Sequence, residues 1–134
     1  MCVSCVSYAQ TGVRERVVFY NTENLFDTRN DTLTADDDFT PRGKRHWNRE
    51  RYTRKLLNIS KVLSSLGAGN FPLLIGLSEV ENRNVVSDLV NKTVLADGNY
   101  GIVHTDSPDT RGIDVALLYR KDSFRLLHNA FFPV

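Results

Sequence analysis

The chain has 134 residues, of which 41% are hydrophobic and 25% are charged, and its net charge is +1. This composition is that of an ordinary globular domain with one hydrophobic core, and it excludes collagen-like, low-complexity and strongly disordered chains. The small net charge creates no overall field that would require a polyanionic partner. Because no apolar run approaches the roughly 20 residues that cross a bilayer, we expect no stable membrane insertion.

The first residues look like the end of an export signal. Apolar residues run into Ser7-Tyr8-Ala9, a small-x-small pattern typical of a cleavage site. We therefore interpret residues 1–9 as a signal remnant and residues 10–134 as the domain, which predicts a periplasmic or extracellular protein. A lipid-attachment site at Val3-Ser4-Cys5 is the alternative, although it lacks the expected leucine. Both cysteines of the chain lie in this segment, so disulfides do not stabilise the predicted domain.

The first predicted strand and helix flank a long loop. Residues 17–21 form a short β-branched and aromatic run, which is typical of a strand. Residues 27–47 show no apolar period and contain a proline and a glycine, so they predict a loop, and a loop of this length is usually functional or mobile. Asn48 is a suitable helix N-cap, and apolar residues recur at three- and four-residue steps from there to Gly67.

The second half of the chain predicts one helix and four strands. An amphipathic helix is expected over residues 84–90. Strands are expected over residues 71–77, 100–104, 114–119 and 124–128. A tight turn at residues 121–123 joins the last two strands as a predicted hairpin. The resulting order β-α-β-α-β-β-β indicates a mixed α/β layer structure without internal repeats.

Charge is unevenly distributed between the first strand and the first helix. A cluster of aspartates lies within residues 27–38, and a run of arginine, lysine and histidine residues follows within residues 42–55. We interpret both as a solvated loop and helix face. The alternative is a surface that faces phosphate groups.

Polar side chains follow two of the predicted strands. Asn21 and Glu23 follow the first, and Glu79 follows the strand predicted at residues 71–77. A layered fold gathers such groups at one edge of a sheet, and carboxylate and amide oxygens suit a hard cation such as Mg²⁺ or Mn²⁺. The alternatives are glutamates that are exposed or cap a loop, and an asparagine that satisfies the backbone of a turn.

Three segments resemble the endonuclease/exonuclease/phosphatase superfamily. Residues 18–27 (VFYNTENLFD) are similar to its opening strand, and residues 77–81 (LSEVE) to its second motif, an apolar strand that ends in a metal-binding glutamate. Residues 111–119 (RGIDVALLY) are similar to the later strand that runs beneath the active site. Their order and spacing agree with the family, and together they span about residues 17–125.

The resemblance implies a four-layer α/β/β/α sandwich of the α/β (α+β) class with mixed sheets. It also implies divalent-metal-dependent hydrolysis of phosphate esters, with a nucleic acid or a small phosphodiester as substrate. By position, Glu79 matches the principal metal ligand and Asn21 matches the asparagine that orients phosphate. Glu23 stands where some members carry a second metal-side carboxylate. Arg111 and Asp114 lie in the third motif, where they contact phosphate or support the site.

The sequence departs from the family in its later motifs. The Gly-Asp-x-Asn and Ser-Asp-His segments, which supply the residues that position the nucleophile and the catalytic Asp–His pair, do not occur here. We therefore interpret the chain as the amino-terminal half of such a hydrolase, inactive by itself. The alternative is a catalytically inactive fragment that binds metal or phosphate, or that associates with a missing half. Either way, one sheet face is left with exposed apolar side chains, which predicts self-association.

Structural roles compete with functional ones at three further residues. Arg111 has Asp109 nearby as a partner for a surface salt bridge. His104 is expected to fill a half-buried strand position. Trp47 is expected to anchor the long loop against the core, with stacking on a base or sugar as its alternative.

Overall fold

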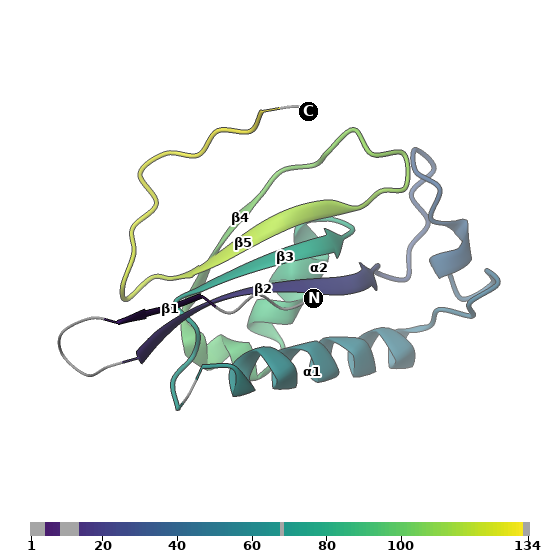
Figure 1. Ribbon diagram of the computed structural model, residues 1–134. Coiled ribbons are helices and arrows are strands. Elements are labelled where there is room, and N and C mark those ends of the chain that lie inside the picture. The colour runs from purple at the N-terminus through teal and green to yellow at the C-terminus, as the bar shows by residue number, and fades with distance from the viewer. Residues whose placement is uncertain (1–4, 9–13, 68, 133–134) are drawn as a thin grey trace.

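One sheet with two helices on a single face makes up the fold (Figure 1). A computed structural model of the chain describes residues 5–8, 14–67 and 69–132. The strands are β1 (Cys5–Tyr8), β2 (Arg14–Leu25), β3 (Leu74–Val80), β4 (Tyr100–His104) and β5 (Asp114–Arg120), and the helices are α1 (Arg49–Ser65) and α2 (Arg83–Asn91). Two short 3₁₀ turns, Asp37–Phe39 and Val94–Gly98, complete the elements. Apart from the β1 backbone, the predicted signal remnant lies outside the described residues.

The sheet is mixed, with the strand order β1-β2-β3-β5-β4. Strands β2 and β3 are parallel, and the other neighbouring pairs are antiparallel. Helix α1 lies between β2 and β3 in the chain, as a parallel pair requires, because two parallel strands need a long crossover connection. The predicted class, a small α/β domain with a mixed sheet, is therefore confirmed.

Both predicted helices are present, and asparagine caps fix where they begin. The side chain of Asn48 accepts a hydrogen bond from the Arg51 backbone N–H at 3.0 Å. The side chain of Asn82 accepts from Asn84 N at 2.8 Å and from Val85 N at 3.1 Å. Each cap satisfies an amide that the first turn of a helix leaves without an internal partner.

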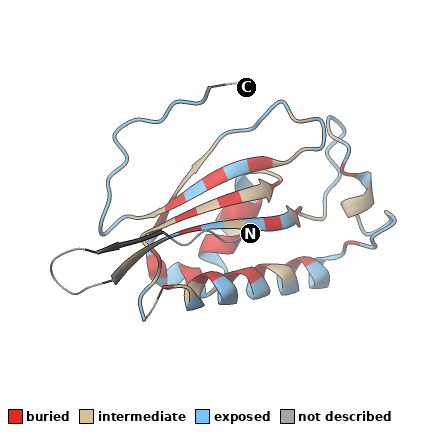
Figure 2. Cartoon of the chain, viewed as in Figure 1, coloured by how far each residue is buried: buried red, intermediate tan, exposed pale blue. Residues whose placement is uncertain are grey.

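The core lies between the helices and one face of the sheet (Figure 2). Alternate residues of β3 and β5 point toward the helices, as the two-residue period of a strand dictates. The central core residues are Val18, Tyr52, Leu56, Ile59, Leu63, Ile75, Leu77, Val85, Val86, Leu89, Val90 and Leu118. Trp47 joins this cluster from the long loop, and its Nε1 donates to the Phe26 carbonyl at 2.9 Å. The predicted anchoring role of Trp47 is confirmed, and its burial leaves little ring surface for stacking on a base.

The opposite face of the sheet carries exposed apolar side chains. Val17, Phe19, Val115 and Leu117 are 47%, 52%, 57% and 40% exposed. Phe19 lies across Gly76, where a Cβ atom would come within 2.7 Å of the ring. The expectation of an uncovered apolar sheet face holds for the described residues. A second sheet, as in a four-layer sandwich, is not among them.

Two sequence predictions about strands are wrong. Residues 124–128 form no strand and are exposed, because β5 already pairs with β3 on one side and β4 on the other. The turn at residues 121–123 is present, but it leads into an irregular segment instead of a hairpin. Strand β3 starts three residues later than predicted and continues to Val80, so Glu79 lies within the strand and not after it.

Candidate functional site

Asn21 and Glu79 lie side by side on neighbouring parallel strands. Asn21 Nδ2 donates a hydrogen bond to Glu79 Oε1 at 3.0 Å, although 58 positions separate the two residues in the chain. The register of β2 against β3 explains the contact, because Asn21 is paired with Ser78. The parallel pair thus brings the two strongest sequence candidates to the same end of the sheet.

The backbone is irregular on both sides of this contact. The register between β2 and β3 shifts after Asn21, and the register between β3 and β5 shifts after Ser78. Glu23, Asn24 and Glu79 have φ angles of 54°, 63° and 60°, in the left-handed region that residues with a Cβ rarely adopt. Such bulges and left-handed residues aim side chains away from the regular pleat, and they concentrate at functional sites.

Hydrogen bonds hold the Glu79 carboxylate in place through both of its oxygens. Oε1 accepts from Asn21, and Oε2 accepts from the Asn24 backbone N–H at 3.1 Å. Asn21 Oδ1 in turn accepts from Glu23 N at 2.7 Å. Buried Thr22 lies below, with its hydroxyl 2.8 Å from the Glu79 carbonyl. Each carboxylate oxygen keeps a second lone pair, so the group can still bind a cation.

Lys55 of α1 supports the turn that follows Asn21. Its Nζ donates to the carbonyls of Glu23 at 2.5 Å and Asn24 at 2.9 Å. Burial lowers the pKa of this ammonium, and the Glu23 carboxylate opposes that effect. The sequence showed Lys55 only as one member of a basic run, because its position depends on how α1 packs against the sheet.

Glu79 also lines a shallow cleft with residues of the β4–β5 connection. The cleft has a volume of about 330 Å³, and Arg111 and Asp114 lie along it. Arg111 forms an ion pair with Asp109 at 2.7 Å, and this exposed bond raises the pKa of the guanidinium, with a smaller effect from Glu79. The structure therefore places Arg111 beside the Asn21–Glu79 pair and also shows the predicted surface salt bridge.

Asp114 lines the same cleft as Glu79, whereas Glu23 does not. The Asp114 side chain is 5% exposed and accepts hydrogen bonds from Ser107 N at 2.7 Å and His104 Nε2 at 3.1 Å, so it anchors the loop. The Glu23 side chain is exposed and lines a different, basic hollow. Of the five sequence candidates, Glu79, Arg111 and Asp114 line the cleft. Asn21 is hydrogen-bonded to Glu79, and Glu23 lines the separate basic hollow.

A family model for the endonuclease/exonuclease/phosphatase family matches residues 16–131. The chain belongs to this family. Searches of curated proteins and of solved structures gave no match. Members of the endonuclease/exonuclease/phosphatase family are phosphoester hydrolases and are typically metal-dependent, and the matched region contains all five sequence candidates.

A second group of potential metal-ligating side chains lies next to the cleft, on β4, β5 and the connection between them, and it shares Asp114 with the cleft. His104, Asp106 and Asp114 each offer one ligand atom, and these atoms lie within 4.8 Å of one another. His104 has a side chain only 2% exposed, with Nδ1 3.9 Å from Asp106 and Nε2 facing Asp114. As a whole residue, His104 is half-buried on β4, as predicted, and its imidazole already has Asp114 as a partner.

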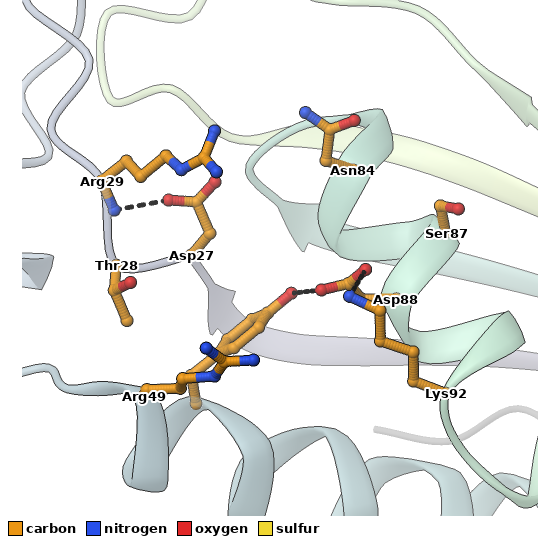
Figure 3. A pocket seen from close by; sticks show the side chains of 9 residues that line it. Asp27, Thr28, Arg29, Arg49, Asn84, Ser87, Asp88 and Lys92 are labelled. Atoms are coloured by element: carbon orange, nitrogen blue, oxygen red, sulfur yellow. Dashed lines mark hydrogen bonds and ion pairs between the residues drawn. The ribbon is translucent and has the colours of Figure 1, made fainter.

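A polar pocket of about 470 Å³ lies on the helix side of the sheet, between the loop after β2 and the two helices (Figure 3). Its groups largely satisfy one another: Tyr52 donates to Asp88 at 3.1 Å, and Lys92 forms an ion pair with Asp88 at 2.7 Å. Nearby, Glu81 accepts from Asp27 N at 2.6 Å, and burial raises the pKa of Glu81 to about 7. Because these contacts hold α1, α2 and the loop together, we interpret the pocket as structural.

Within the described residues, no helix has the length and apolarity that would let it cross a membrane.

Proposed function

We propose that this chain carries the metal- and phosphate-binding part of a divalent-metal-dependent phosphoester hydrolase. The observation that supports the proposal best is the 3.0 Å contact between Asn21 and Glu79 at the end of two parallel strands. Family membership supplies the reaction class, and the cleft beside Arg111 supplies space for a substrate.

The residues present suit Mg²⁺ or Mn²⁺. Glu79 offers a carboxylate that is already oriented by two donors, and hard cations bind such oxygens, often through only one or two carboxylates with water and phosphate completing the shell. When bound, the cation acts as a Lewis acid that stabilises negative charge on phosphate oxygens. The exposed Glu23 carboxylate, two residues along β2, lines the separate basic hollow, so we assign the metal-binding carboxylate to Glu79.

The remaining groups bind and orient phosphate. The Asn21 amide uses one N–H for Glu79 and has another for a phosphate oxygen. Arg111 presents a guanidinium, a fork of donors that matches phosphate, at the same cleft. Asp114 acts indirectly, because its carboxylate accepts a hydrogen bond from Ser107 N and so holds the loop that carries Arg111.

None of these cleft residues is a suitable general base for activating water. His104 is buried and bonded to Asp114, and the family's Gly-Asp-x-Asn and Ser-Asp-His motifs are absent from this sequence. We therefore propose that these residues and a second sheet over the Val17–Phe19 face, which would complete a four-layer sandwich, come from outside the described residues. A second candidate function follows from the same absence: a domain that binds metal and phosphate without turnover.

Metal binding and turnover together test the proposal. Mn²⁺ affinity is measured by isothermal titration calorimetry for the native chain, Glu79→Gln and Glu50→Gln, the last removing an exposed glutamate of α1. Glu79→Gln should weaken Mn²⁺ binding by roughly tenfold or more, and Glu50→Gln should not. Equal affinity of the native chain and Glu79→Gln would refute the site.

Hydrolysis of bis(p-nitrophenyl) phosphate with Mn²⁺ then separates the two functions. Turnover that Glu79→Gln abolishes supports the hydrolase. Binding at Glu79 without turnover supports the second candidate.

A further inference from the structure

A basic hollow lies on the other side of the turn from Glu79, and the proposed function does not use it. The hollow has a volume of about 290 Å³ and is formed by the loop before α1 and the first turns of that helix. Four cationic side chains, Lys44, Arg45, Arg51 and Lys55, line it together with the carboxylate of Glu23. These cations belong to the basic run at residues 42–55, for which a phosphate-facing surface was one of the two interpretations of the sequence.

The cations of the hollow lack carboxylate partners. Among residues 14–67 and 69–132, none of these four forms an ion pair, whereas Arg54 on the same helix is paired with Glu50 at 2.6 Å. Arg51 and Lys55 instead donate to backbone carbonyls, which bear no net charge. The Glu23 carboxylate offsets one of the four positive charges, and the net positive charge that remains can be neutralised by a mobile anion.

Aromatic side chains orient two of these cations, Arg45 and Lys55, before any ligand binds. Phe39 stacks on Phe26 with ring centroids 4.2 Å apart and meets the edge of Trp47 at 6.2 Å. The Arg45 guanidinium lies 4.7 Å from the Phe39 ring, and Lys55 Nζ lies 5.6 Å from the Trp47 ring. Cation–π contacts of this kind order long side chains, and ordering before binding reduces its entropic cost.

The hollow is coupled directly to the cleft site. Lys55 binds the carbonyls of Glu23 and Asn24, and the Asn24 N–H binds the Glu79 carboxylate. An anion in the hollow therefore lies one turn of backbone from a phosphate held at Glu79. A ligand that fills both positions must carry two phosphates in close succession.

We infer that the hollow is a second phosphate-binding site, which takes the backbone phosphate next to the one at Glu79 in a nucleic-acid strand. This inference rests on the proposed function for the first phosphate. A polynucleotide fits better than a phosphomonoester, because only a ligand with successive phosphates fills both the basic hollow and the cleft beside Glu79.

Oligonucleotide binding without metal tests this site separately from hydrolysis. The anisotropy of a fluorescein-labelled twelve-nucleotide single strand is followed in EDTA over a range of NaCl concentrations, with the native chain, Lys44→Gln, Arg45→Gln and the control Arg54→Gln. Lys44→Gln and Arg45→Gln should each weaken binding by roughly three- to tenfold and lower the slope of log K against log salt by about 0.7. Arg54→Gln should change the affinity by less than about twofold, because its charge is already paired.

The outcomes distinguish this inference from the proposed function. Native affinity and slope in Lys44→Gln and Arg45→Gln would overturn the second site and leave the metal experiment at Glu79 untouched. Equal losses in Arg54→Gln would also overturn it, since they would show nonspecific attraction. Phosphatidylserine vesicles that bind through these residues while the oligonucleotide does not would overturn it in favour of a membrane surface. Circular dichroism of each variant confirms that the fold is retained.

Discussion

The left-handed backbone at Glu79 makes a prediction about stability that is independent of catalysis. Glu79 has a φ of 60°, and its carbonyl is held by the Thr22 hydroxyl at 2.8 Å. Glu79→Ala and Glu79→Gly both remove the carboxylate and its two hydrogen bonds. The two variants therefore differ only in the Cβ atom at this backbone position, and their comparison isolates the cost of the left-handed conformation.

The magnitude follows from two opposing terms. A left-handed conformation costs a residue with a Cβ atom roughly 1–2 kcal/mol more than it costs glycine. Glycine loses more chain entropy on folding, which offsets about 0.5–1 kcal/mol of that advantage. Glu79→Gly should therefore be more stable than Glu79→Ala by about 0.5–1 kcal/mol. At Lys61, an exposed position in the middle of α1, the order should reverse, because alanine exceeds glycine in a helix by about 1 kcal/mol.

Urea unfolding followed by circular dichroism in EDTA measures all four variants. With a slope of about 1–3 kcal/mol per molar urea, the Glu79 pair should differ in midpoint by roughly 0.2–1 M. The sign of the difference at position 79 must be opposite to the sign at position 61. If alanine is the more stable residue at both positions, the strained backbone that we describe at the site does not exist in solution.

Two further predictions concern charge and surface. Because burial raises the pKa of Glu81 from 4.5 to about 7, the folded chain keeps a proton that the unfolded chain releases, so stability should fall as pH rises between these values. Glu81→Gln keeps an acceptor for Asp27 N, and in EDTA its stability should no longer depend on pH in this range. At pH 8 its free energy of unfolding should exceed that of the native chain by about 1–2 kcal/mol, after allowing for solvent access. Urea midpoints that change in parallel with pH for both proteins would contradict this. Val115→Lys places a charge on the exposed sheet face and should reduce self-association, which sedimentation velocity measures. Val94→Lys is the control, because Val94 is an exposed valine outside that face. Equal sedimentation of the native chain and Val115→Lys would refute this role of the face.

Both helices and four of the five predicted strands could be identified from the sequence because their signals are local. An asparagine cap and a three- to four-residue apolar period locate α1, and β4 and β5 lie where alternation predicts them. The segment at residues 124–128 has strand-like composition, yet the predicted hairpin requires a free edge on β5. Both edges of β5 are already used, and this is a property of the whole sheet that no short window contains.

The candidate site was predictable where it depends on strand ends and not where it depends on packing. Asn21 and Glu79 follow apolar runs, and two parallel neighbours bring them together. Lys55 gave no comparable signal, because only the placement of α1 against the turn at residues 23–24 turns a surface lysine into a support for that turn. The sequence also did not predict the register shift between Ser78 and Val80, beyond which β3 continues to pair with β5, so that Glu79 lies inside the strand.

Asp114 shows why a family position does not fix a physical role. Its carboxylate is almost fully buried, bonded to the His104 imidazole and to Ser107 N, so solvent and substrate do not reach it. A buried carboxylate without partners is costly, and these two donors offset that cost. The loop that they hold carries Arg111 to the cleft beside Glu79. In the proposed function, Asp114 therefore contributes by orienting Arg111, and a substitution at position 114 is expected to alter that orientation without removing a phosphate contact.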